Sequence, residues 1–357
     1  MSIRGLLVAK SKLIQYFKYN GRDIASLEPD VDNRIIDLLT LIRTQYGDGM
    51  TVDFASIARY FTLDVLSTVA FGRPFGFMAA NDDLWDYNKT TSGFMLVLNL
   101  VANHASVRWL FYSHAAQALG GPKITDKSGV GPMLRFAREA VAERFGPKSV
   151  VKQDMLGHFV SRGLSQVQCE AEANLQIVAG SDSTTTVLRS ILFLLVGTPL
   201  AYLKIRAEID EAVASGTISS DPIKYSESLK LPYLQACVWE GLRLFPPLFG
   251  LKAKVAPVGG DTIKGVYYPE GTEMSICDDA LCRNPEIFGS DAHLYRPERW
   301  LDATAGAKTQ YRHTVDSVFG SGRFQCLGRH IAMMELHKAT VEVCCVASRA
   351  SPMRCYV

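Results

Sequence analysis

The sequence predicts a mainly α-helical fold with one small region of β-structure. Three observations support this prediction. Apolar side chains recur at helical spacing through most of the first two thirds of the chain, and no proline interrupts the stretch from Ser165 to Gly197. β-Branched runs separated by Gly and Pro turn signals are concentrated between Lys254 and Ile276. We therefore expect a large helical region that carries a small sheet.

Each expected helix shows apolar residues three or four positions apart, which indicates one buried face. The clearest segments are 35–46, 54–71, 165–197, 200–215 and 233–245. The 165–197 segment is apolar at both ends and polar in the middle, so it is expected to be one long central helix with an unusual centre. The 233–245 helix should stop at the two prolines that follow it, since proline disfavours helix in the preceding residue. A last helix is expected from Cys326.

Composition excludes several classes of protein. The chain has 357 residues, 48% of them hydrophobic and 21% charged, which is too apolar for a disordered protein. Its 38 basic residues nearly balance 36 acidic ones, so no overall charge favours nucleic acid. Eight cysteines without regular spacing do not indicate a disulfide scaffold. No apolar run approaches the roughly 20 residues that a membrane-spanning helix needs, and residues 1–20 lack the apolar core of a signal peptide.

The segment from Phe319 to Ala332, FGSGRFQCLGRHIA, indicates the most specific chemistry. Two glycines before the cysteine permit a tight turn, and Gly328 removes a side chain where a flat cofactor or another backbone must approach closely. A helix starting at Cys326 would place the sulfur at its positive end, beside Arg323 and Arg329, which favours the thiolate. A lone cysteine is more often an ordinary core residue, but this pattern favours an axial ligand of haem iron.

This segment resembles the haem-binding loop of the cytochromes P450, and two further motifs of that family follow the expected order. Glu240 and Arg243 match its Glu-x-x-Arg helix, and Pro297-Glu298-Arg299-Trp300 matches its Pro-Glu-Arg-Phe/Trp segment. The resemblance implies the cytochrome P450 fold, a large helical domain with a small β-sheet subdomain, and haem whose iron is bound by Cys326. Taken alone, Glu240 and Arg243 would be an ordinary surface pair. With Arg299 we assign them a structural role.

The polar centre of the long helix, Ala179 to Thr186, resembles the oxygen-binding stretch of the same family. There an acid and a hydroxyl relay protons to oxygen, a role that the resemblance transfers to Asp182, Ser183 and Thr184. Ser183 stands where threonine is usual and lacks the methyl group that fixes the rotamer, so proton delivery is expected to be leakier. Small Ala179 and Gly180 would let the helix lie against the porphyrin. The alternative is a helix cap or kink that binds nothing.

Further haem contacts are implied by the resemblance. The family usually places a basic residue two positions before the cysteine, where Phe324 stands here. Gly-basic-aromatic-x-Cys-Leu-Gly loops are typical of the fungal branch that includes pisatin-demethylase-like enzymes. Lys254 matches a second basic position that reaches a haem propionate. The residues expected to contact haem are Phe319, Gly322, Arg323, Gly328 and Lys254.

The pocket above the haem is expected to be lined by the apolar stretch that follows the Glu-x-x-Arg helix. Leu248, Phe249 and Leu251 would supply this lining, although such a stretch is equally compatible with plain core.

The resemblance extends from about residue 15 to 345, so we expect residues 1–357 to be one partial cytochrome P450 domain. In full-length relatives a membrane anchor, a first sheet and a helix with a Trp-x-x-x-Arg motif precede the position of Tyr19. The last residues, 347–357, show no strand pattern. We therefore expect a chain shortened at both ends.

The implied function is a haem-thiolate monooxygenase that inserts one oxygen atom of O2 into a small apolar metabolite, in fungal secondary metabolism. Electrons would come from NADPH through NADPH–cytochrome P450 reductase. The alternative is a truncated, non-catalytic remnant that binds haem weakly or not at all. Full-length relatives are expected at the endoplasmic reticulum membrane, and this chain as written in the cytoplasm.

Four basic residues near the cysteine would suit an acidic redox partner, although a solvated basic face explains them equally well. These residues are Arg312, Arg323, Arg329 and Lys338.

Overall fold

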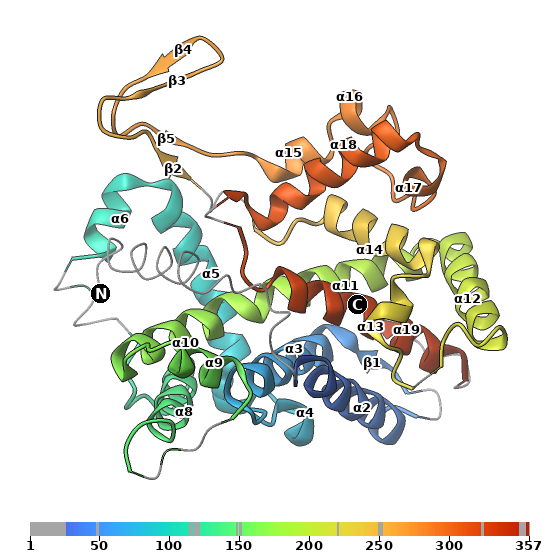
Figure 1. The fold of residues 1–357 in the computed structure, drawn as a ribbon, viewed down its shortest axis with the longest axis horizontal. Helices are drawn as coiled ribbons and strands as arrows, with labels where there is room; N and C mark the ends of the chain where they lie inside the picture. The colour runs from blue at the N-terminus through green and yellow to red at the C-terminus, as the bar shows by residue number, and fades with distance from the viewer. Residues whose placement is uncertain are drawn as a thin grey trace.

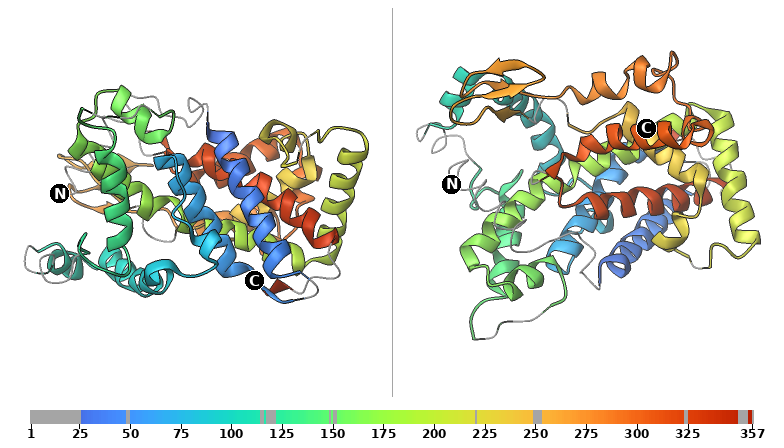
Figure 2. Two further views of the ribbon diagram at one scale, coloured as in Figure 1. Left: turned by 90° about the horizontal axis from the view of Figure 1, so that it is seen from below. Right: turned by 45° about the horizontal axis from the view of Figure 1, so that its top comes forward.

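The structure is a computed structural model, viewed in Figures 1 and 2. It describes most of the chain after residue 25. The described residues are 26–47, 50–113, 116, 122–147, 149, 152–219, 221–248, 253–322, 325–349 and 355–356. Within these limits the fold is mainly helical, as the sequence predicts.

A long helical rod crosses the centre of the molecule (Figure 1). It consists of α10 (Gln166–Gly180) and α11 (Asp182–Val196), which are separated only at Ser181. A capping box between Ser165 and Gln168 begins α10, which explains why the helix starts there. The predicted central helix is therefore present, but it is interrupted in its polar middle.

Helix α3 (Phe54–Phe71) packs against the rod from below in Figure 1, and α2 (Leu27–Gln45) packs against α3. The Asp53 side chain caps α3, and Gly72 ends it in a left-handed conformation. By length and composition α3 could cross a membrane, but 78% of its apolar window is buried inside the protein. Two bent helix pairs, 84–111 and 166–214, pass the same test only when each is taken as one broken span. In this structure α3 is a core helix.

Three further helices pack against α11, the second half of the rod: α12 (Pro199–Ala214), α14 (Pro232–Leu244) and α19 (Arg329–Arg349). Helix α19 also contacts α2 and the short α13 (Tyr225–Ser228). It begins at Arg329, three residues after the cysteine at which its start was expected. Helix α12 begins with Pro199 at its first turn, where proline is tolerated.

The remaining helices surround this core. Those before the rod are α4 (Phe77–Ala80), η1 (Leu84–Asp86), α5 (Tyr87–Asn103), α6 (Ala105–Phe111), α8 (Gly131–Ala142) and α9 (Met155–Ser161). Those between the sheet region and α19 are α15 (Asp278–Cys282), α16 (Pro285–Phe288), α17 (Arg299–Asp302), α18 (Ala305–Asp316) and η2 (Ser317–Phe319).

The β-structure consists of three two-stranded pairs among the described residues. Strands β2 (Lys254–Val255) and β5 (Glu273–Met274) pair antiparallel, as do β3 (Asp261–Ile263) and β4 (Val266–Tyr268). These four strands lie in the predicted region and form the hairpin at the upper left of Figure 1. A third pair joins β1 (Val52–Asp53) to β6 (Cys355–Tyr356) in parallel. The expectation that residues 347–357 contain no strand was therefore wrong.

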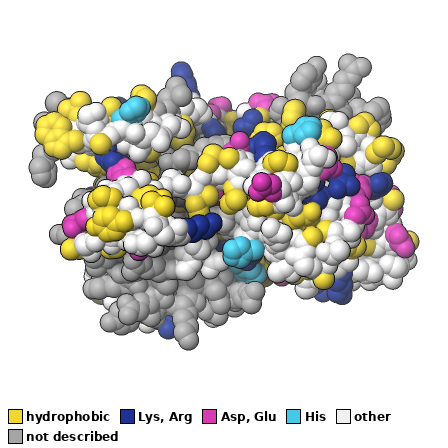
Figure 3. All heavy atoms as spheres, turned by 90° about the horizontal axis from the view of Figure 1, so that it is seen from above, with side chains coloured by type: hydrophobic (Ala, Val, Ile, Leu, Met, Phe, Trp, Pro, Cys, Tyr) yellow, Lys and Arg dark blue, Asp and Glu magenta, His cyan; other side chains and the backbone are white. Residues whose placement is uncertain are grey.

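The hairpin region exposes apolar side chains (Figure 3). Val258 is 88% exposed and Tyr267 is 60% exposed, while Trp109 on α6 is 77% exposed. Arg108 of α6 is joined by an ion pair to Glu273 of β5. Helix α6 and the strand pair are therefore neighbours on this face.

Candidate functional site

Cys326 is exposed in the loop that joins η2 to α19. Its backbone N–H donates to the Phe319 carbonyl at 2.6 Å, and the Gln325 N–H donates to the Gly322 carbonyl at 3.1 Å. These bonds fold the loop back on itself, so that Cys326 comes close to the residue that begins the motif. The sulfur precedes the first turn of α19, where unpaired amides favour a negative charge.

Gly322 and Gly328 of this loop are glycine for different reasons. Gly322 has φ +57°, a left-handed conformation that disfavours other residues. Gly328 has no such conformation, and among the residues that the structure describes a Cβ built there meets only Cys326 Sγ, at 3.9 Å. Protein packing therefore does not require glycine at 328. The space beside the sulfur suits a flat group that approaches closely, as predicted for haem.

An ion pair closes the base of this loop. The Arg329 Nε and Nη2 atoms lie 2.7 and 2.6 Å from Asp316 Oδ1, and the same guanidinium lies 5.5 Å from the centre of the Phe319 ring. Asp316 ends α18, and Arg329 begins α19. Sequence analysis missed Asp316, because nothing in its local pattern distinguishes it from other surface acids.

Asp182 begins α11, directly after the break in the rod. Its Oδ1 atom lies 3.5 Å from Arg59 Nε on α3 and accepts no hydrogen bond within the described residues. Burial raises the pKa of the Asp182 carboxyl above its ordinary value, and the Arg59 guanidinium opposes that shift. Arg59 offsets only part of the effect of burial on the Asp182 carboxyl. This carboxyl can therefore change its protonation state more easily than one held by several hydrogen-bond donors.

The hydroxyl groups after Asp182 bond to the helix itself. Ser183 Oγ donates to the Ala179 carbonyl at 3.2 Å, and Thr184 Oγ1 to the Gly180 carbonyl at 3.5 Å. Thr185 shares a 2.6 Å hydrogen bond with Thr62 of α3. Back-bonding of this kind bends helices, which agrees with a break at Ser181. The structure thus places Asp182, Ser183 and Thr184 in one helical turn, with the acid turned toward α3.

One face of the rod is uncovered at this point. Ala179 and Thr186 are exposed and Ser183 is half-buried, although they lie in the middle of the protein. A Cβ on Gly180 would lie 2.7 Å from Leu66 Cδ1 on α3. Gly180 therefore serves helix packing, and the expectation that it faces the porphyrin was wrong. The open face of small side chains and the loop of Cys326 lie on neighbouring elements, since α11 and α19 pack against each other.

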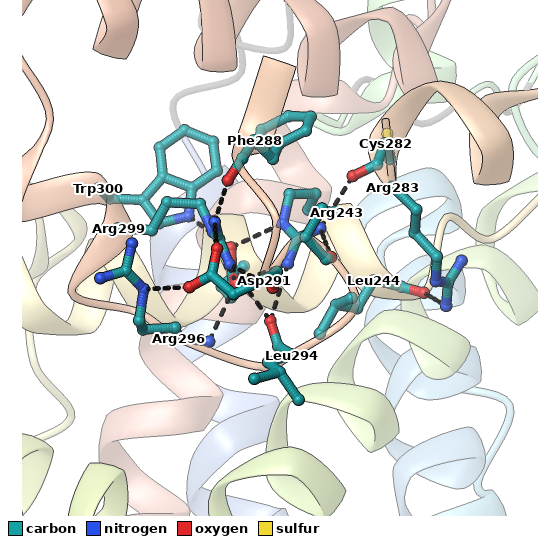
Figure 4. A network of polar contacts seen from close by, with 12 residues as sticks. Arg243, Leu244, Cys282, Arg283, Phe288, Asp291, Leu294, Arg296, Arg299 and Trp300 are labelled. Carbon is teal, nitrogen blue, oxygen red and sulfur yellow. Dashed lines mark hydrogen bonds and ion pairs between the residues drawn. The ribbon is translucent and has the colours of Figure 1, made fainter. Parts of the chain in front are cut away.

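Arg243 and Arg299 lie in one buried network (Figure 4), and both bind Glu240. Glu240 Oε1 accepts from Arg243 Nη2 at 2.7 Å and Arg299 Nε at 3.3 Å, and all three side chains are at most 1% exposed. The Trp300 indole N–H donates to Glu240 Oε2 at 2.9 Å, a contact that sequence analysis did not foresee.

The two arginines of this network also bind backbone carbonyls. Arg243 donates to the Cys282, Ala292 and Leu294 carbonyls, and Arg299 donates to the carbonyls of Phe288 and Asp291. The network therefore fixes the course of residues 282–294, a stretch with little regular structure.

Of the other residues predicted to contact haem or substrate, the structure describes only some. Lys254 is exposed on β2, opposite Met274 in the ladder. Leu248 is 38% exposed. Three further candidates, Arg323, Phe249 and Leu251, lie outside the described residues.

The basic residues expected to meet a redox partner differ in exposure. Lys338 is fully buried, and its Nζ lies 2.7 Å from Glu28 and 2.6 Å from Asp32 of α2. The prediction was therefore wrong for Lys338, which joins α19 to α2. Arg312 is exposed and stacks on the Trp239 ring at 4.0 Å.

Comparison with known proteins places this geometry in one family. The family model described as Cytochrome P450 matches residues 9–343. The solved structure of the cytochrome P450DA haem domain superposes with a TM-score of 0.68 at 18% identity, covering 94% of this chain and 70% of that chain. The observed fold is therefore that of a cytochrome P450.

Fungal proteins are similar over nearly the whole chain. Cytochrome P450 monooxygenase ABA1 of Pyricularia oryzae is 40% identical over 91% of this chain, and aba1 of Botryotinia fuckeliana is 35% identical over 94%. Pisatin demethylase of Fusarium vanettenii is 27% identical over 91%. The chain spans 65%, 67% and 64% of these relatives, respectively.

Proposed function

Because the chain belongs to the cytochrome P450 family, we propose that it is a haem-thiolate monooxygenase. The reaction would insert one oxygen atom of O2 into a small apolar metabolite. The observation that most directly supports this proposal is the exposed Cys326 thiol, in a turn before α19 with no side chain at Gly328.

The residues present can hold the cofactor in a defined way. Cys326 would bind the iron, and Gly328 would leave room for the ring beside the sulfur. When bound, the haem supplies activation of O2 at its iron, which electron donation by the thiolate promotes. Phe319 bonds the Cys326 amide through its carbonyl and so helps to fix the position of the sulfur.

Proton delivery would come from the first turn of α11. Burial raises the pKa of the Asp182 carboxyl above its ordinary value, so this acid binds a proton more readily than an exposed aspartate does. The Ser183 hydroxyl donates to the Ala179 carbonyl and retains lone pairs that can accept a proton from a neighbouring acid or water. Arg59 holds the Asp182 carboxylate toward α3, so this acid must turn away from Arg59 before it can reach the open face.

Electrons would come from NADPH through NADPH–cytochrome P450 reductase. Arg312 is exposed on α18, and Arg329 begins α19, so both lie near the loop of Cys326. The Arg312 guanidinium is the better suited of the two to an acidic partner surface, because Asp316 offsets the charge of Arg329.

For the substrate we propose a small apolar metabolite of fungal secondary metabolism. The names of the similar fungal proteins, which include a pisatin demethylase, support this class. Leu248, exposed after α14, is a candidate for the pocket wall. The substrate itself is not specified by these residues, since pocket walls vary on a common fold.

The experiment is a reduced, CO-bound difference spectrum of the purified chain after reconstitution with haem. We expect the absorption band of a thiolate-ligated haem, and we expect Cys326→Ser to abolish it. Cys277→Ser is the matched control, because Cys277 is the other exposed cysteine among the described residues. Absence of the band in the unaltered chain would overturn the proposal in favour of a non-catalytic remnant. Survival of the band in Cys326→Ser would overturn the assignment of Cys326 as the ligand.

A further inference from the structure

Asp316 and Arg329 each occupy an unfavourable position within their own helices. Asp316 is the last residue of α18, where the helix dipole is negative, and Arg329 is the first residue of α19, where it is positive. Each charge is therefore slightly destabilising locally. The ion pair between them accounts for both unfavourable positions, because each charge is neutralised by the other across the loop.

The contact also has a defined geometry. Two nitrogens of Arg329 converge on one oxygen of Asp316, at 2.7 and 2.6 Å, and the guanidinium covers the Phe319 ring. Asp316 and Arg329 bracket residues 317–328, which include Cys326. The second closure of the same loop is the bond from the Cys326 N–H to the Phe319 carbonyl. One guanidinium thus contacts both the start of the loop and the residue to which the cysteine amide is bonded.

We propose that Asp316 and Arg329 are a positioning pair that closes the loop of Cys326 and fixes the direction of its sulfur. This inference rests on the proposed function for its consequence at the haem, but the closure itself is a property of the chain without cofactor. Because Asp316 offsets its charge, Arg329 acts on the sulfur mainly through loop geometry. This corrects the electrostatic role expected for Arg329 from the sequence.

The first test uses the chain without haem. Hydrogen exchange, read by mass spectrometry on peptides that cover residues 317–328, reports the bond of the Cys326 amide. We expect Asp316→Asn and Arg329→Gln to exchange about fivefold faster there, the size expected for a partly exposed ion pair. Arg329→Lys, which keeps the charge but loses the paired nitrogens, should fall between them and the unaltered chain.

The reversed pair Asp316→Arg/Arg329→Asp restores the contact and suits both helix dipoles, so its exchange should return to that of the unaltered chain. Asp37→Asn is the matched control, because Asp37 forms an ion pair with Arg34 at 2.9 Å on α2, far along the chain from the loop. Protection of α14 amides shows whether each variant is folded. The proposal is overturned if the single variants exchange at the unaltered rate, or if the reversed pair is no better than they are.

The second test adds haem and measures the fraction of the CO complex that shows the thiolate band. The single variants should lose part of this band, and the reversed pair should regain it. If the unaltered chain binds no haem, the proposed function fails, whereas the exchange experiment still decides whether the pair closes the loop. An unchanged band in variants whose loops exchange faster would overturn the positioning role.

Discussion

Glu240 is a fully buried carboxylate and Asp182 a half-buried one, and each lies beside an arginine, yet their surroundings differ. Glu240 accepts five hydrogen bonds, from Arg243 twice, from the Arg296 backbone, from Arg299 and from Trp300. Asp182 has a single ion-pair contact, with Arg59 at 3.5 Å. A carboxylate with many donors is fixed in charge and position, whereas one with few can exchange a proton or turn. The difference separates a structural acid from a candidate relay.

The largest effect is expected from Glu240→Gln. The change leaves Arg243 and Arg299 buried without their shared counter-charge, which should lower the free energy of unfolding by about 3–5 kcal/mol. Urea unfolding followed by circular dichroism measures it. Glu143→Gln is the control, since its ion pair with Arg73 is exposed and should matter by less than about 1 kcal/mol. Equal losses in the two variants would contradict the structural role of Glu240.

Asp182→Asn should leave the fold intact and impair proton delivery. If Asp182 supplies protons, coupled product formation should fall by about tenfold or more while NADPH consumption continues. The measurement is the ratio of product formed to NADPH consumed in the reconstituted enzyme. Asp210→Asn, which alters an exposed ion pair on α12, is the control. Unchanged coupling in Asp182→Asn would remove this residue from the mechanism.

Trp300→Phe removes one of the five donors to Glu240 and keeps an aromatic ring in place. Because four donors remain, we expect a loss of only about 1.5 kcal/mol in the free energy of unfolding. The same urea titration detects it. A loss as large as that of Glu240→Gln would mean that the network depends on every donor rather than on the carboxylate.

Arg59→Met removes the ion-pair partner of Asp182 and should cost less than about 1 kcal/mol at neutral pH. The folded pKa of Asp182 is already raised by burial, so the folded state binds the proton more readily than the unfolded state. The free energy of unfolding therefore falls as pH rises between the unfolded and folded pKa values. Without Arg59, the pKa of Asp182 in the folded state rises further. The pH range over which the free energy of unfolding falls then becomes wider.

Unfolding measured across acid to neutral pH tests the Arg59 prediction. The decline with rising pH should extend to higher pH in Arg59→Met, and this extension should disappear in Arg59→Met/Asp182→Asn. The decline due to other buried acids, such as Glu335 and Asp64, should remain in both variants. If the single variant shows the same pH dependence as the unaltered chain, Arg59 does not control the Asp182 carboxyl.

The sequence predicted the fold well where periodicity or local motifs determine it. The 54–71 helix has the observed bounds, and Glu240, Arg243 and Arg299 do meet. Apart from this network, which the family resemblance implies, it did not predict contacts between distant positions. Arg59 lies far from Asp182 in the sequence, and Asp316 has no feature that identifies Arg329 as its partner.

Two of the errors, at Gly180 and Lys338, share one physical cause. Gly180 and Lys338 were assigned to the cofactor and to the surface from their residue type, but type alone does not fix the direction of a side chain. Gly180 faces Leu66 of α3, and Lys338 faces two acids of α2. The direction of each side chain depends on how α2 and α3 pack against the neighbouring helices. A local sequence pattern holds no information about that packing.

The arrangement at Ala179 and Gly180 has a consequence for engineering this protein. A larger side chain at Ala179 would project from the open face of the rod, where it could reduce the volume available to a substrate. A side chain at Gly180 would instead point at the end of the Leu66 side chain on α3, which would have to move aside to admit it. Libraries aimed at altered substrate preference should therefore vary position 179 and keep glycine at 180.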